Sequence, residues 1–237
     1  MSSTTKSFVL PGDAIPIEVT TGKHIKIGPG LFHVSGSSTP GVIIATRAGT
    51  LESNLKKKEY WIDSNATRYS PAAQESVIGI VTAKSADGYR VDIGSAHTAY
   101  LDALSFEGAS KRNKPNLKVG STIYARVSLA HKDMEPELEC FDAQSRKAEG
   151  FGELKGGFVV QCGLKLCRRL FDPEYFLLPT LGATFPIEVV IGTNGRVWTR
   201  TTDSRGTIAV ARCIEAVDAL AYDERQIKSF LNTMDLP

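Results

Sequence analysis

Between residues 77 and 142, short apolar runs recur at even spacing, and this pattern limits the possible fold more than any other feature. Apolar and polar residues alternate over 89–93 and again over 123–129, as they do in a strand with one buried face. Asp87 and Gly88 form a tight-turn pair before the first of these runs. Further strands are expected at 77–81, 98–101 and 137–141. Short strands separated by glycine turns predict a closed all-β barrel.

A barrel of the oligonucleotide-binding (OB) type offers a strand face and loops to single-stranded nucleic acid. Basic residues in the loop 108–115 could meet phosphates, and aromatic rings on the strands could stack on bases. The candidate RNA-binding residues are therefore Lys111, Arg112, Lys114, Tyr89 and Tyr100. The alternatives stay open, because charged loops are often only solvated and strand aromatics often belong to the core.

The segments on either side of the barrel differ in character. Residues 1–67 hold short apolar runs separated by glycine and proline, which predicts a small N-terminal β domain. Residues 68–147 form the predicted S1-type OB-fold barrel. Residues 148–237 combine strand patterns with helical apolar spacing at 164–171 and 208–221. The expected strands of this last part are 156–162, 186–191 and 197–201. The predicted fold class is therefore mainly β with an α+β C-terminal part.

The last part contains a tetrad, Gly192, Thr193, Asn194 and Gly195, with the G-x-x-G spacing of a KH domain. In KH domains this loop clamps a nucleic-acid backbone, and the tetrad makes residues 148–237 a predicted KH-like α+β domain. Here, however, the tetrad joins two predicted strands, and an Asn-Gly pair is a strong hairpin signal. Neither middle residue is basic. We therefore predict a structural tetrad, with phosphate gripping as the alternative.

Charge and composition exclude several classes of protein. The 28 basic and 26 acidic residues leave a formal charge of +2, which is small for a protein that binds nucleic acid through its overall charge. The N-terminus lacks the apolar segment of a signal peptide, and no apolar stretch reaches the about 18 residues of a membrane helix. The cysteines form no C-x-x-C pair, which favours buried reduced thiols. We expect a soluble protein in a reducing compartment.

Three glutamates at alternate positions are the only arrangement that suggests catalysis. Glu135, Glu137 and Glu139 would lie on one strand face, as in a metal-dependent nuclease. Pro136 interrupts this strand, and no second acidic cluster completes a site. The histidines form no zinc motif, and the sequence has neither a phosphate loop nor a nucleophile elbow. We therefore expect a protein that is not an enzyme and has no metal or cofactor, with a nuclease as the alternative.

Several short motifs also follow one another in a characteristic order. They are Pro11-Gly12-Asp13, Gly28-Pro29-Gly30, Arg68-Tyr69 with Pro71, Val77-Ile78-Gly79, residues 109–115, Val119-Gly120 with residues 124–127, residues 137–142, Gly150-Phe151-Gly152, and residues 191–195 with Trp198. Together they resemble the S1/KH-type cap subunits of the RNA exosome, and most of all the eukaryotic cap protein that carries G-x-N-G. The resemblance covers nearly the whole chain.

The resemblance implies a non-catalytic subunit that bridges ring subunits of the exosome, with these and the other cap subunits as partners. It would help guide RNA into a central channel, where other subunits degrade RNA from the 3′ end and process ribosomal RNA. The implied locations are the nucleus, nucleolus and cytoplasm. Ser85, Ala86 and Asp102 depart from the general S1 pattern, which implies weak RNA contact that depends on the complex. A free-standing single-stranded RNA-binding protein is the alternative.

Overall fold

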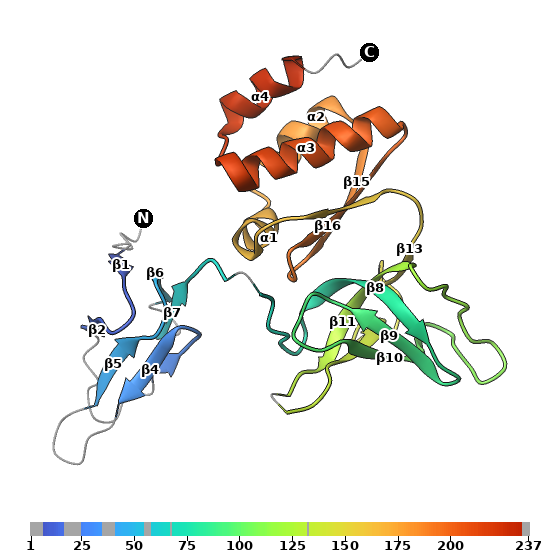
Figure 1. Ribbon diagram of the computed structural model, residues 1–237, viewed down its shortest axis with the longest axis horizontal. Coiled ribbons are helices and arrows are strands. Elements are labelled where there is room, and N and C mark those ends of the chain that lie inside the picture. The colour runs from blue at the N-terminus through green and yellow to red at the C-terminus, as the bar shows by residue number, and fades with distance from the viewer. Residues whose placement is uncertain are drawn as a thin grey trace. The chain divides into compact units, whose positions relative to one another are not determined.

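The computed structural model describes residues 7–16, 25–34, 41–54, 58–66, 68–131 and 133–233 (Figure 1). The chain divides into two compact units, Met1–Asn65 and Ala66–Pro237. Among the described residues, no helix has both the length and the apolar character needed to cross a membrane.

The first unit is built from two small sheets. One sheet has the strand order β1-β6-β7-β3, and the other has the order β2-β5-β4. The strands are β1 (Ser7–Val9), β2 (Ala14–Ile15), β3 (Lys26–Ile27), β4 (Leu31–Val34), β5 (Val42–Ala45), β6 (Gly49–Asn54) and β7 (Glu59–Asp63). The core shared by these strands is small and consists of Val9, Ile15, Ile43, Ala45 and Ile62.

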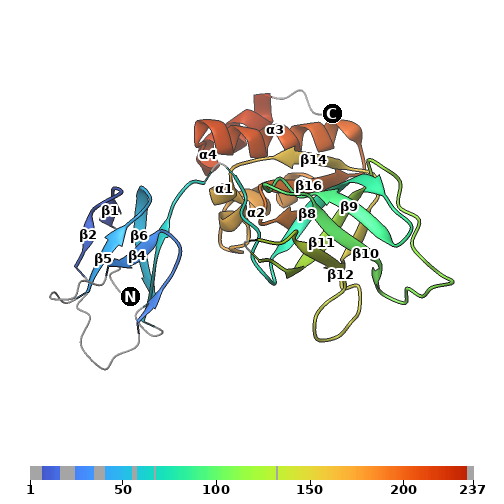
Figure 2. The ribbon, with the colours of Figure 1, turned by 60° about the horizontal axis from the view of Figure 1, so that its bottom comes forward.

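The second unit begins with the barrel, whose strands appear in Figure 2. They are β8 (Ser76–Lys84), β9 (Gly88–Asp92), β10 (Ala99–Phe106), β11 (Thr122–Leu129), β12 (Glu137–Cys140) and β13 (Gly152–Leu154). The sheet order is β12-β10-β9-β8-β11-β13, and β12 also pairs with β11. This second pairing of β12 closes the sheet on itself, so the barrel has the OB-type closure that the alternating runs predicted.

The barrel core follows from the alternation in the sequence. The inward side chains of each strand are almost wholly buried; they include Val77, Val81, Tyr89, Val91, Ala99, Leu101, Ile123, Ala125, Val127 and Leu138. Outward positions on the same strands stay exposed, as at Arg90 and Leu104. The barrel is therefore filled by side chains, and any ligand must bind on its outer surface or loops.

The barrel sheet extends past the predicted boundary at residue 147. Strand β13 pairs with β11 along Tyr124↔Gly152 and the two following pairs. Phe151, just before β13, stacks on Tyr124 with the ring centroids 4.8 Å apart. This aromatic contact and the main-chain pairing hold the start of the predicted third domain against the barrel.

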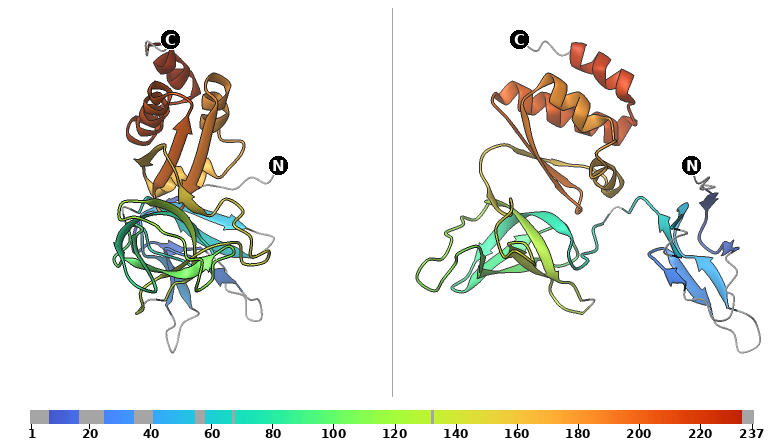
Figure 3. Two further views of the ribbon diagram at one scale, coloured as in Figure 1. Left: turned by 90° about the vertical axis from the view of Figure 1, so that its right-hand side faces the viewer. Right: turned by 180° about the vertical axis from the view of Figure 1, so that it is seen from behind.

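The C-terminal part is a three-stranded sheet with helices. Its elements are β14 (Phe158–Gln161), α1 (Leu164–Leu170), α2 (Leu177–Thr184), β15 (Ile187–Gly192), β16 (Arg196–Thr201), α3 (Ser204–Leu220) and α4 (Glu224–Thr233). The strand order is β14-β16-β15, and α3 packs on β14 and β16. Figure 3 shows α3 and α4 on the side of this sheet away from the barrel. The elements and their sheet order confirm the predicted fold class, mainly β with an α+β C-terminal part.

The helices differ in part from the expectation. Helix α2 was not predicted. Its sequence contains Pro179 and Gly182, which disfavour a helix, but Pro179 falls in the first turn, where its missing N–H is not needed. Helix α3 starts before the expected residue 208, because the Asp203 side chain accepts a hydrogen bond from the Arg205 main-chain N–H. Helix α4 follows a left-handed residue, Ala221.

We predict that Leu101→Ala destabilises the second unit by about 2–5 kcal/mol, because it leaves a cavity in the barrel core. Urea unfolding of the full chain measures this change. Leu104→Ala on the same strand is the matched control, since Leu104 is 42% exposed and Leu101 is fully buried. We expect the control to change stability by no more than about 0.5 kcal/mol. Equal effects of the two variants would contradict the assignment of the core face.

Candidate nucleic-acid interface

The G-x-N-G tetrad forms the turn between β15 and β16. Gly192 ends β15, and Gly195 precedes β16 with a φ of +78°. The Gly195 carbonyl accepts a hydrogen bond from the Cys162 N–H at 2.9 Å. A Cβ atom at Gly195 would lie 2.8 Å from the Cys162 carbonyl oxygen. Glycine is therefore required here both by the backbone conformation and by the close approach of β14.

Asn194 is buried and bonds three main-chain groups of the barrel. Its Oδ1 accepts from the Ile78 N–H at 3.1 Å. Its Nδ2 donates to the carbonyl of Ile78 at 2.8 Å and to that of Ile93 at 2.9 Å. Both sides of the amide are thus used on β8 and on the residue after β9. The tetrad faces the barrel, and the side chain in its centre has no free donor for a phosphate.

Arg196 adds a charged contact beside this amide. Its Nη2 lies 2.6 Å from the Asp92 Oδ2, and its Nη1 donates to the Asp92 main-chain carbonyl at 2.6 Å. Burial of the Asp92 carboxyl opposes its ionisation. The Gly94 N–H and the Arg196 guanidinium outweigh this effect and hold the pKa of Asp92 below its usual value. The ion pair therefore joins β9 to β16 at neutral pH.

Thr193 completes the joint between the barrel and the KH-like part. Its N–H and its hydroxyl both donate to the Ser76 carbonyl, at 2.9 and 3.0 Å. Nearby, the Tyr69 hydroxyl donates to Glu75 at 2.5 Å, and burial and this carboxylate raise the pKa of Tyr69. We call the contacts of Thr193, Asn194 and Arg196 with the barrel the barrel–KH joint.

A second candidate surface is the long loop between β10 and β11. Ser110 and Asn113 exchange main-chain hydrogen bonds at 3.1 and 3.0 Å, which makes a tight turn. Lys111 and Arg112 occupy the tip of this turn, and both are exposed. Neither side chain has an ion-pair partner among the described residues. The loop therefore presents two free positive charges to solvent.

Other predicted RNA contacts are placed differently. The Lys114 ammonium donates to the Ala86 carbonyl at 3.2 Å and lies 3.8 Å from Asp87, so its charge is partly used within the barrel. Tyr89 is 2% exposed, and its hydroxyl donates to the Pro115 carbonyl. The Tyr89 ring has no free face for a base, and its prediction as an RNA-binding residue is therefore wrong. The ring belongs to the barrel core.

Tyr100 lies on the outer face of β10 and is partly exposed. Burial, followed by the carboxylates of Asp102, Asp87 and Glu137, raises the pKa of its hydroxyl. These three carboxylates give the ring an acidic surrounding, which opposes the approach of a phosphate. RNA contact by Tyr100 stays a prediction.

The three alternate glutamates do not face one site. Glu135 pairs with Arg90 at 3.0 Å, and Glu139 pairs with the buried Arg126. Glu137 is exposed on β12. Across the described ranges, no group of three histidine, cysteine, aspartate or glutamate residues could hold a metal ion. The two ion pairs stabilise the barrel instead of assembling a metal site.

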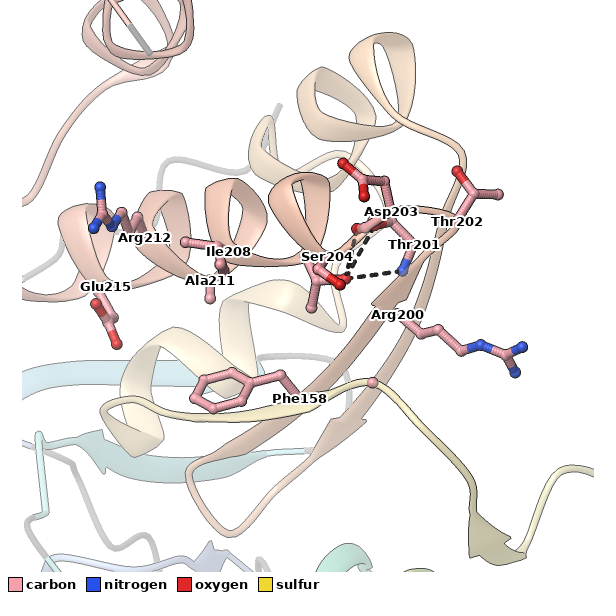
Figure 4. Close-up of a pocket in the computed structure, with 12 residues that line it drawn as sticks. Phe158, Arg200, Thr201, Thr202, Asp203, Ser204, Ile208, Ala211, Arg212 and Glu215 are labelled. Carbon is pink, nitrogen blue, oxygen red and sulfur yellow. Dashed lines mark hydrogen bonds between the residues drawn. The ribbon is translucent and has the colours of Figure 1, made fainter. Parts of the chain in front are cut away.

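A groove of about 510 Å³ runs along α3 beside β14 (Figure 4). The Phe158 ring lies on the β14 side and Ile208 on the α3 side, and each is 54% exposed. The charged lining residues balance one another, because Arg200 and Arg212 stand against Asp203 and Glu215. A groove that follows a phosphate backbone needs a surplus of positive charge. The groove therefore adds little to a nucleic-acid surface.

Sequence reasoning missed the part of the joint outside the tetrad. Arg196 directly follows the tetrad, and Asp92 is a polar position of the alternating run 89–93, at the end of β9. Their opposite charges were a weak signal, because nothing in the sequence shows that the two strands meet. The main-chain acceptors on Ile78 and Ile93 carry no sequence signal at all.

Comparisons with known proteins agree with this architecture. Residues 69–152 match the S1 domain of the family described as exosome complex component RRP40, and residues 25–68 match the family "Exosome complex exonuclease Rrp40 N-terminal domain". Residues 157–205 match a KH domain family.

Individual relatives are similar over most of their length. The exosome complex component rrp40 of Schizosaccharomyces pombe is 44% identical over 225 residues, which cover 94% of this chain and 92% of that protein. The "Putative exosome complex component rrp40" of Dictyostelium discoideum is 43% identical over 235 residues, or 98% of this chain and 93% of that protein. A solved structure titled "Crystal structure of putative exosome complex RNA-binding protein" superposes with a TM-score of 0.58 at 25% identity, covering 70% and 94% of the two chains.

We predict that Asn194→Ala lowers the free energy of unfolding by on the order of 3 kcal/mol, because it leaves buried main-chain groups of Ile78 and Ile93 without their partner. Urea unfolding of the full chain measures the loss. Asn113→Ala in the exposed turn is the control, and we expect a change within about 0.5 kcal/mol. An Asn194→Ala variant as stable as the wild type would contradict the role of this amide in the joint.

The Asp92–Arg196 pair predicts a dependence on pH. The folded-state pKa of Asp92 lies below that of the unfolded chain, so its ionised form stabilises the fold above about pH 3.9, the usual pKa of an unfolded Asp. This contribution is lost as the pH falls through the folded-state pKa. Thermal unfolding of the wild type and of Asp92→Asn should therefore differ at pH 7 and converge in acid. A difference that persists in acid would point to packing instead of charge.

Proposed function

Because the chain belongs to the Rrp40 family of exosome complex components, as its sequence motifs predicted, we propose that it acts as a non-catalytic, RNA-binding cap subunit of an exosome. The observation that carries this proposal is the barrel–KH joint. Asn194 and Arg196 use their polar groups on the barrel, so the two RNA-binding domain types form one scaffold. A scaffold of this kind suits a subunit that positions RNA for chemistry carried out elsewhere.

Two features support a role without catalysis. Two of the three acidic side chains that suggested a nuclease are neutralised in pairs, Glu135 by Arg90 and Glu139 by Arg126. Two buried polar side chains of the second unit, Asn194 and Arg196, are occupied by contacts with main-chain groups of the barrel. In this proposal, other subunits of the complex degrade RNA from the 3′ end and process ribosomal RNA.

The exposed turn of the loop between β10 and β11 is the proposed RNA contact. Lys111 and Arg112 at its tip carry free positive charges, and Lys114 holds the base of the loop through Ala86 and Asp87. Two cations can neutralise only a few phosphates, which gives weak affinity by themselves. RNA binding is therefore strong only where neighbouring subunits add their own contacts.

The first unit supports docking onto other subunits. Phe8, Leu10 and Phe32 are 71%, 54% and 59% exposed, although they are large apolar side chains. Burial of such side chains against a partner is a common source of binding energy. We propose that exosome ring subunits and the other cap subunits are these partners, and that the protein works in the nucleus, nucleolus and cytoplasm.

The function is tested by purifying the tagged protein from its own cells and identifying the co-purified chains by mass spectrometry. We expect a stoichiometric exosome ring whose RNA degradation follows a separate subunit. Recovery of the chain alone, with tight RNA binding that weakens steeply with salt, would favour a free-standing RNA-binding protein instead. RNA cleavage by the isolated chain with added metal, lost in Glu137→Gln, would favour a nuclease.

We predict that Lys111→Glu combined with Arg112→Glu weakens RNA binding by the assembled complex, because it replaces two phosphate contacts with repulsion. RNA protection by the reconstituted complex measures the effect at several salt concentrations. If both side chains contact phosphates, Lys111→Ala with Arg112→Ala reduces the magnitude of the slope of log affinity against log salt by about 1.4. Each contact with a single strand accounts for about 0.7 of this slope.

A charge-matched control comes from the exposed side of α4. Arg225→Glu with Lys228→Glu makes the same change in net charge at another surface. We expect this control to protect RNA like the wild type. Equal loss in both double variants would mean that only the overall charge matters, and no loss in either would reject the loop as an RNA contact.

A further inference from the structure

Two cysteines near the barrel–KH joint are in direct sulfur contact. The Sγ atoms of Cys162 and Cys167 lie 3.3 Å apart. Cys162 directly follows β14, and Cys167 is the fourth residue of α1. All four cysteines of the chain belong to the described residues and are free thiols, and this is the one sulfur–sulfur contact found among them.

We propose that Cys162 and Cys167 are a thiol pair that a peroxide converts into an intrachain disulfide. A disulfide bond is about 2.05 Å long, so the two sulfurs need to approach by only about 1.2–1.3 Å. The main chain is held at both ends of the pair. The Cys162 N–H donates to the Gly195 carbonyl at 2.9 Å, and the Cys167 N–H donates to the Gly163 carbonyl at 3.1 Å.

The two cysteines have different access to solvent, which assigns the order of the steps. Cys162 is partly exposed, whereas Cys167 is fully buried. The Cys162 thiol gives up its proton, and the thiolate attacks one peroxide oxygen, so that an S–O bond forms and the O–O bond breaks. The departing hydroxide takes up a proton and leaves as water. The Cys167 sulfur then attacks the Cys162 sulfenic acid, the S–S bond forms, and the S–O bond breaks to release a second water. Two thiols lose two electrons and two protons to the peroxide.

Proximity separates this pair from the other cysteines. Cys140 lies in the barrel core and Cys213 on α3, and both are buried without a sulfur contact. A sulfenic acid formed at Cys162 meets its resolving thiol at once, and such intramolecular reactions are strongly favoured over bimolecular ones. The hydrogen bond with Cys167, burial and the charge of Asp218 raise the pKa of Cys162. Little Cys162 thiolate is therefore present near neutral pH, which makes the first step slow there, and the proximity of the Cys167 sulfur is what favours the second step.

The position of the pair gives the bond a structural consequence. Cys162 supports the tetrad through the Gly195 carbonyl, and a Cβ at Gly195 would touch the Cys162 carbonyl. A disulfide would tie this end of β14 to α1, directly behind the turn that contacts the barrel. The thiol chemistry itself depends neither on RNA binding nor on assembly into a complex.

The test treats the full-length folded protein with hydrogen peroxide, alkylates the remaining thiols and digests the chain with trypsin. Cleavage after Lys165 and Arg168 places Cys162 in the peptide 156–165 and Cys167 in the peptide 166–168. We expect these two peptides to appear joined, with a mass lower by two hydrogens than their sum, and to separate after reduction. Cys140 and Cys213 should remain alkylated.

Two matched variants make the result decisive. Cys167→Ser should abolish the joined peptides and leave Cys162 overoxidised or alkylated, whereas Cys213→Ser should leave the cross-link unchanged. Circular dichroism after treatment verifies that each protein is still folded. Four alkylated cysteines in the treated wild type, or Cys162 as sulfinic acid without a bond to Cys167, would overturn the proposal.

Discussion

The second unit depends on one buried amide. Asn194 satisfies a donor on Ile78 and acceptors on Ile78 and Ile93, and no water is needed to complete the set. Burying an amide of this kind raises the free energy of the folded state unless all its hydrogen-bond partners are present. This requirement fixes the position of the β15–β16 turn on the barrel. Arg196 and Thr193 then extend the contact to Asp92 and Ser76.

This constraint also bears on the proposed RNA contact. In a phosphate-gripping KH loop, the G-x-x-G main chain and its flanking residues face solvent. Here the same segment faces the barrel, and the free cations of the second unit that were predicted to bind RNA lie in the turn at Lys111 and Arg112. In the proposed function, the KH-like part therefore contributes shape and support, and the barrel loop contributes charge.

The sequence predicted most of the architecture because period-two alternation directly reports which strand face is buried. Prediction failed for short elements and for the placement of single side chains, which this alternation does not report. Helix α2 was not predicted, since Pro179 and Gly182 disfavour a helix in its sequence. Strand β13 was not predicted because a three-residue strand has too few positions to show a period. Tyr89 was misassigned as a stacking residue. An alternating pattern shows that a strand has two faces, but it does not show whether a given aromatic ring points into the barrel core or out to solvent. The loop contacts stay predictions.

The barrel side of the Asn194 contact consists only of main-chain atoms. Every residue type except proline presents the same N–H and C=O at positions 78 and 93, so substitutions in the barrel strands leave the contact chemically unchanged as long as the strand path is kept. The one side chain that makes this contact, Asn194, lies in the four-residue turn. The barrel strands can therefore diverge in sequence around Asn194, whereas the neighbouring Arg196 still needs the side chain of Asp92.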